Sequence, residues 1–110
     1  SDTEAVQERN LERIIVQKWI AIFPLGVEAW SEHRRTGYPK LLPVPTDKSG
    51  GSVNVEQGAR RLPYPVEEYQ QNNANLQAAI QTLGAEQQNG DRSGDVMGTR
   101  VWWDCKPYNK

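Results

Sequence analysis

ERIIVQKWIAIFPLGVEAWSEHRRTGYP, residues 12–39, is the stretch that decides the fold of this chain. Apolar side chains in its first half recur at the three- and four-residue spacing of an α-helix, but they fill two faces of that helix instead of one. The first face includes Ile14, Ile15 and Trp19, and the second includes Val16, Ile20 and Phe23. Because burying a large apolar side chain contributes about 1.5–3 kcal/mol, we expect both faces to be covered.

The residues at the N-terminus predict where this helix begins. Ser1, Asp2 and Thr3 are each suitable N-caps. Glu4 then lies in the first turn, where the positive end of the helix dipole favours a carboxylate. Pro24 has no amide hydrogen, so we expect it to occupy the first position of a second helix over PLGVEAWSEHRR.

The second helix has several stop signals. Arg34 and Arg35 suit the negative end of the helix dipole. Gly37 can adopt a left-handed cap, and Pro39 cannot continue the helix. The stretch therefore predicts two helices, from Glu4 to Arg35, joined by a tight turn.

The remainder of the chain is mostly loop. The residues after Lys40 are rich in proline and glycine, which predicts a surface loop with at most a short strand over SVNVE. Pro65 can start a single helical turn that runs to Tyr69. A third, amphipathic helix is expected over ANLQAAIQTL, capped by Asn72 or Asn73 and ended by Gly84.

Composition narrows the classes of function. Thirteen basic and fourteen acidic residues in 110 give a net charge of −1, so no positive excess is available to bind nucleic acid. The longest apolar run, IAIFPLGV, is too short to cross a bilayer. Cys105 is the single cysteine, so no internal disulfide can form, and we interpret it as an incidental thiol.

Glu28 and Glu32 are the strongest candidates for a catalytic pair. One helical turn separates them, as a glycosidase with two carboxylates would allow. The structural alternative pairs Glu32 with Arg35 and places Arg34 over Trp30, and we favour it because these spacings are those of neighbours on a helix.

Metal and cofactor chemistry lacks the usual residues. His33 is the only histidine, so the usual zinc ligand sets cannot be assembled from this chain. NGDRSGD, residues 89–95, offers oxygen ligands for calcium but lacks the closing glutamate of an EF-hand loop, and we favour a polar turn. We expect no metal, no cofactor and no catalytic residue.

Trp102 and Trp103 close the chain in the segment GTRVWWD, which we expect to be extended. Successive side chains of an extended segment point to opposite faces. At most one of the two rings can therefore stack on a sugar while the other packs inward, and we favour anchoring of the C-terminus over sugar binding.

Three separated motifs together resemble a known family. ERIIVQKWIAIFPLGVEAWSEHRRTGYP, RRLPYPVEEYQQNN and TRVWWD are similar to the C-terminal part of SusD/RagB nutrient-binding outer-membrane lipoproteins of Bacteroidetes, in their SusD-like subgroup. The likeness extends from about Glu12 to Asp104. It implies a mainly α fragment of a larger, tetratricopeptide-containing fold, with long loops and short extended segments.

The resemblance also implies a function and partners. Members of the family are non-catalytic, bind starch and other glycans or nutrients, and deliver them to a TonB-dependent transporter of the SusC type. They are surface-exposed on the outer membrane and anchored through a lipid on a segment that this chain lacks. No ligand-binding residue is carried over, because the sugar-binding aromatic residues of the family come mostly from segments upstream of this region.

We therefore expect three parts. Residues 1–39 are paired helices that pack on a helical body contributed by the N-terminal remainder of the same protein. Residues 40–71 are a proline- and glycine-rich loop with an extended segment, and residues 72–110 are a short helix, a polar loop and the extended WWD segment. The alternatives are a free-standing helical module that binds another protein and, less favoured, a small glycosidase using Glu28 and Glu32.

Overall fold

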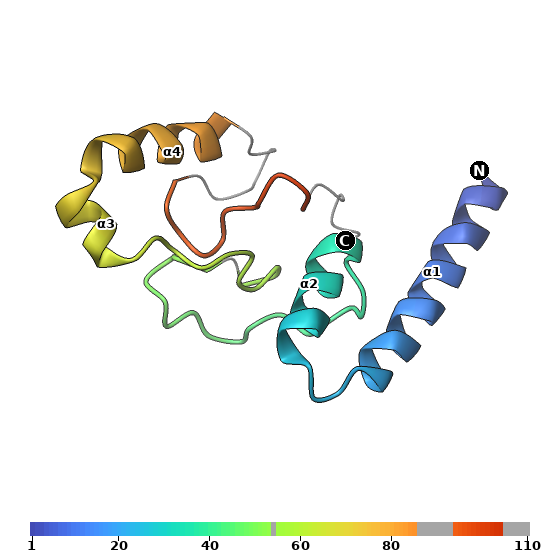
Figure 1. Ribbon diagram of the computed structural model, residues 1–110. Coiled ribbons are helices and arrows are strands. Elements are labelled where there is room, and N and C mark those ends of the chain that lie inside the picture. Colours follow the sequence, from blue (N-terminus) through green and yellow to red (C-terminus); the bar gives the residue numbers. More distant parts are fainter. Residues whose placement is uncertain (54, 86–93, 105–110) are drawn as a thin grey trace. The chain divides into compact units, whose positions relative to one another are not determined.

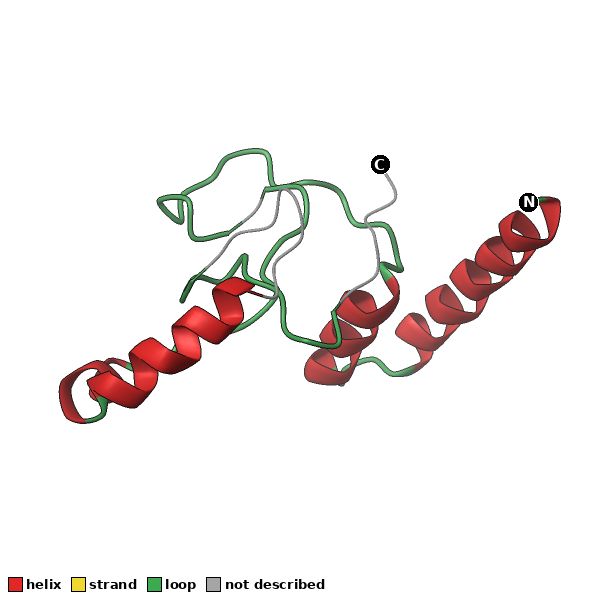
Figure 2. Cartoon of the chain, turned by 90° about the horizontal axis from the view of Figure 1, so that it is seen from above, coloured by secondary structure: helices red, strands yellow, loops and turns green. Residues whose placement is uncertain are grey.

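The computed structural model of the chain describes residues 1–53, 55–85 and 94–104. Its helices are α1 (Asp2–Ala21), α2 (Gly26–Thr36), α3 (Val66–Gln71) and α4 (Asn73–Ala85) (Figure 1). Loops join them, and no strand is drawn in the described part of the chain (Figure 2). The predicted mainly α fold with long loops is confirmed. None of the described helices is both long enough and apolar enough to span a membrane.

The chain divides into two compact units. Residues Ser1–Leu41, with α1 and α2, belong to the first unit. The described residues from Leu42 onward, with α3 and α4, belong to the second.

The first unit begins with the cap predicted for α1. Ser1 is the N-cap, and its hydroxyl accepts a hydrogen bond from the Glu4 amide at 3.4 Å. The Glu4 side chain in turn binds the Ser1 backbone, which completes a capping box and satisfies donors that a helix start leaves without partners. The sequence therefore located this helix start correctly.

The turn between α1 and α2 differs from the prediction. Pro24 was expected at the first position of the second helix, and this is wrong, because α2 begins at Gly26 with Leu25 as its N-cap. The Leu25 amide donates to the Ile22 carbonyl at 2.7 Å, and the Gly26 amide donates to the Pro24 carbonyl at 2.8 Å. These bonds place Pro24 inside the turn, so α2 begins two residues later than predicted.

The end of α2 follows the prediction. Gly37 adopts a left-handed conformation with φ 77°, and its amide donates to the His33 carbonyl at 2.8 Å. The buried Tyr38 comes next, and its hydroxyl donates to Glu8 of α1 at 2.7 Å. This bond joins residues thirty positions apart and fixes the end of α2 against α1.

Much of the apolar surface of α1 remains exposed. Only Ile15 of this helix is buried. By contrast, the side chains of Ile14 and Ile20 are 64% and 60% exposed, and that of Phe23, two residues beyond the helix, is 85% exposed. Among the described residues, part of each apolar face expected from the sequence therefore remains exposed.

In the second unit, backbone hydrogen bonds connect separate loops. The Val44 amide donates to the Val55 carbonyl at 2.8 Å, but the described residues of SVNVE form bends and turns instead of the short strand that the sequence allowed. Two further bonds reach the C-terminal segment. The Gly98 amide donates to the Ser52 carbonyl at 2.8 Å, and the Arg60 amide donates to the Met97 carbonyl at 2.7 Å.

Helices α3 and α4 agree with two predicted elements. Pro65, the expected first residue of this turn, is the N-cap of α3, so the helix begins one position later than predicted, at Val66. In α4 the predicted apolar face includes Leu76, which is buried. Gly84 was expected to end this helix, but α4 continues through it to Ala85 because an isolated glycine only weakens a helix.

Candidate functional site

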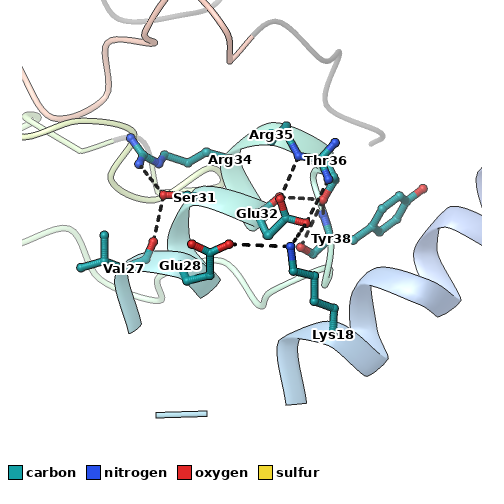
Figure 3. Close-up of polar contacts among 9 residues, drawn as sticks. All are labelled: Lys18, Val27, Glu28, Ser31, Glu32, Arg34, Arg35, Thr36 and Tyr38. Carbon is teal, nitrogen blue, oxygen red and sulfur yellow. Dashed lines mark hydrogen bonds and ion pairs between the residues drawn. The ribbon is translucent and has the colours of Figure 1, made fainter. Parts of the chain in front are cut away.

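Four charged residues of the first unit form a cluster between α1 and α2 (Figure 3). Lys18 of α1 places its Nζ atom 3.2 Å from an oxygen of Glu32 and 3.7 Å from an oxygen of Glu28. Arg35 donates from Nε and Nη2 to the two oxygens of Glu32, at 2.8 and 2.9 Å. The predicted pair between Glu32 and Arg35 is therefore confirmed.

This cluster keeps Glu32 ionised. The hydrogen bonds from Arg35 lower the pKa of Glu32, burial opposes them, and Lys18 lowers the pKa further. A glycosidase needs one carboxylic acid with a raised pKa to protonate the leaving group. Glu28 and Glu32 instead share one lysine, which is the arrangement of a structural ion-pair network that joins two helices.

The other side chains near the end of α2 are also held in place. The Arg34 guanidinium lies 3.5 Å from the centre of the Trp30 ring, as the sequence predicts. Its Nη2 atom is also 3.4 Å from the Ser31 hydroxyl (Figure 3). The Nδ1 atom of His33 lies 3.0 Å from the Pro39 carbonyl. Since a carbonyl only accepts, Nδ1 must carry the hydrogen and donate it.

In the second unit, Arg60 and Asp104 form a buried ion pair that the sequence did not reveal. Arg60 donates from Nε at 2.7 Å and from Nη2 at 2.6 Å to the two carboxylate oxygens. Both side chains are 1% exposed. Forty-four residues separate the partners, and no sequence periodicity connects positions so far apart. In the sequence, only the family resemblance connects the two residues, because Arg60 belongs to the motif RRLPYPVEEYQQNN and Asp104 to the motif TRVWWD.

Asp95 is the centre of a second polar cluster. Its carboxylate accepts from Arg61 Nη1 at 2.6 Å, from the Tyr64 amide at 2.9 Å, and from the Tyr69 hydroxyl. Burial raises the pKa of Asp95, but the hydrogen bonds from Tyr69, Arg61 and Tyr64 outweigh it and leave the pKa below its usual value. The hydrogen bond to Asp95 also raises the pKa of Tyr69.

Only Gly94 and Asp95 of the possible calcium-binding run NGDRSGD belong to the described residues. Residues 89–93 lie outside the described residues, as does Cys105. Asp95, the last residue of that run, is engaged by Arg61 and two tyrosines. Across residues 1–53, 55–85 and 94–104, no group of three or more possible metal ligands gathers at one place.

Trp102 and Trp103 are the central residues of a turn, not of the extended segment that was expected. The Asp104 amide donates to the Val101 carbonyl at 2.9 Å and closes the turn. Trp102 is 78% exposed, whereas Trp103 is half-buried. The two rings therefore differ in exposure, as expected. The difference arises from a turn and not from the alternation of side chains along an extended segment.

A comparison with protein-family models gives one match. The SusD-like model, described as Susd and RagB outer membrane lipoprotein, matches residues 1–104. Among curated proteins, no relative matches the chain.

Solved structures of SusD homologues are similar to the chain. One from Bacteroides thetaiotaomicron VPI-5482 is 58% identical with a TM-score of 0.82, over 94% of this chain and 21% of that one. One from Bacteroides ovatus ATCC 8483 is 56% identical with a TM-score of 0.80, over 90% and 20% of the two chains. A chitin-binding SusD homologue from Flavobacterium johnsoniae is 45% identical with a TM-score of 0.75, over 91% and 19%. The chain spans about a fifth of the length of these relatives.

Proposed function

The chain belongs to the SusD-like family of SusD and RagB outer-membrane lipoproteins, and we propose that it is part of a longer cell-surface protein that binds glycans without cleaving them. The match of the family model to residues 1–104 is the observation that carries this proposal. We call the longer protein the parent protein. Its ligand, partners and location are proposed from the family and not from side chains of this chain.

A glycan is the ligand class that the relatives favour. One solved relative, 45% identical to this chain, is described as chitin-binding. By the family resemblance, the parent protein would deliver its glycan to a SusC-type TonB-dependent transporter in the outer membrane. A lipid on a segment of the parent protein outside residues 1–110 would hold it at the cell surface.

The exposed apolar surface of α1 and of the turn after it supports an origin in a larger protein. Ile14, Ile20 and Phe23 are more than half exposed, and leaving such side chains in water forgoes several kcal/mol. The remaining four-fifths of the relatives' length provides a partner of the right kind. We propose that residues 1–39 pack on that helical body, with 40–71 and 72–110 following as the two parts expected from the sequence.

The absence of catalysis is part of the proposal. Glu28 and Glu32 are the one carboxylate pair that the sequence put forward, and the bonds of Glu32 to Arg35 and Lys18 lower its pKa and favour its ionised form. A carboxylate held ionised in this way is poorly suited to act as a general acid.

The test is to express the full reading frame that contains this chain and titrate the parent protein with chitin and starch oligosaccharides by calorimetry. We expect saturable binding of one glycan class, with the oligosaccharides recovered intact by chromatography. Surface proteolysis of whole cells should remove the protein, and purification from membranes should recover a TonB-dependent transporter with it. Oligosaccharide cleavage that is lost in Glu32→Gln would refute the non-catalytic function.

A further inference from the structure

Helices α3 and α4 form an outlying part of the second unit, residues 66–85, which we call the arm (Figure 2). Little of it is buried. In the described part of the arm, no residue of α3 is buried, and Leu76 of α4 is the one buried apolar side chain. Segments with few buried apolar contacts open locally at a lower free energy than a well-packed core.

The loops beside the arm are held more firmly. Arg60 and Asp104 form their buried bidentate ion pair there. The backbone amides of Arg60 and Gly98 donate to the carbonyls of Met97 and Ser52 at 2.7 and 2.8 Å. We call the loops that carry these bonds the base. Because a buried ion pair and bonds between separate loops must break together, we expect the base to open at a higher free energy than the arm.

The Asp95 carboxylate joins the arm to the base where the chain enters the arm. It accepts hydrogen bonds from the amide of Tyr64, two residues before α3, and from the Tyr69 hydroxyl within α3. Arg61 donates to the same carboxylate at 2.6 Å and lies 4.8 Å from the centre of the Tyr64 ring. The side chains of Arg61 and Asp95 are 8% and 6% exposed, so water competes little for the carboxylate.

We propose that Asp95 is a latch for the arm: its bond to the Tyr69 hydroxyl keeps the arm closed, and loss of that bond lets the arm open as a unit while the base stays folded. A hydrogen bond from a hydroxyl to a carboxylate is among the stronger kinds in proteins. Since little apolar burial accompanies it, this bond supplies a large share of what keeps the arm closed. Arg61 and Tyr64 precede the arm in the chain, so their bonds hold the carboxylate in place when the arm opens.

The experiment measures native-state hydrogen exchange of the full parent protein at neutral pH. Tyr69→Phe removes the hydroxyl and keeps the ring, so the variant should fold. The amides of Asn72 and Leu76 donate to backbone carbonyls at 3.0 Å and report opening of the arm. Their protection factors should fall by about tenfold or more, as expected for the loss of a hydrogen bond to a charged group. The amides of Arg60 and Gly98 report the base, and their protection should not change.

Asn75→Ala is the matched control. It removes an exposed side-chain bond, from Asn75 to Asn72 at 2.7 Å, that lies wholly within the arm. We expect no loss of protection in this variant, because alanine is the better helix former. A fall in the arm alone, found in Tyr69→Phe and not in Asn75→Ala, supports the latch.

Two results would overturn the proposal. If the arm and the base lose protection together in Tyr69→Phe, the second unit opens as one body and has no separate arm. If the arm of this variant keeps its full protection, the bond to Asp95 is not what holds it closed.

Discussion

Substituting Asp104 by asparagine should strongly destabilise the second unit. The change keeps the shape of the side chain but removes the charge that balances Arg60. Both side chains are 1% exposed and are joined by two hydrogen bonds of 2.6 and 2.7 Å, so water cannot replace the lost partner. Breaking a buried pair from one side costs about 3–5 kcal/mol, and this geometry indicates the upper part of that range.

Native-state hydrogen exchange on the parent protein measures this loss within the unit concerned. The amides of Arg60, Gly98 and Asp104 each donate to a backbone carbonyl of the second unit and report its opening. A loss of about 3–5 kcal/mol should lower their protection factors by roughly 10²- to 10⁴-fold.

Two variants make the result specific. Glu28→Gln breaks a 3.7 Å ion pair whose glutamate is 55% exposed, and it should change stability by less than about 1 kcal/mol. The double variant Arg60→Met with Asp104→Leu removes both charges and should recover most of the loss, because no unbalanced charge stays buried. A loss below about 1 kcal/mol in Asp104→Asn, or no recovery in the double variant, would refute the reasoning.

Two further predictions concern Asp95 and Gly37. The folded-state pKa of Asp95 is below its ordinary 3.8, so its ionised form stabilises the fold above that value and the contribution disappears as pH falls through the folded pKa. Hydrogen-exchange protection factors of the second unit should therefore fall below about pH 4, and Asp95→Asn should flatten this acid dependence; an unchanged dependence would contradict the prediction. Gly37→Ala should destabilise α2 by about 1 kcal/mol, measured by hydrogen exchange, because a Cβ meets nothing within 4 Å and only the left-handed backbone opposes it. Gly26→Ala, also unobstructed but with no such backbone, is the control and should stabilise the same helix slightly.

Local signals in the sequence located the helices. The cap at Ser1, the left-handed Gly37 and the i,i+3 pair between Glu32 and Arg35 all depend on neighbours within four positions, where helical geometry leaves few alternatives. The position of Pro24 was predicted wrongly because the fixed φ of proline and its missing amide hydrogen suit a turn as well as the start of a helix.

Long-range pairs were not predictable in the same way. Asp104 and Asp95 lie forty-four and thirty-four residues from Arg60 and Arg61, and only the folded chain brings each pair together. The exposed position of Trp102 likewise depends on a turn closed by Asp104, which the expectation of an extended segment did not include.

The hydrogen bond from Tyr38 to Glu8 has a consequence for how the first unit meets its surroundings. Together with the bond from Lys18 to Glu32, it closes the hairpin at both its open and its turn end. The two helices are thus tied to each other by polar contacts within the first unit. If residues 1–39 pack on the rest of the parent protein as proposed, the exposed Ile20 and Phe23 would be presented to it by helices that are already paired.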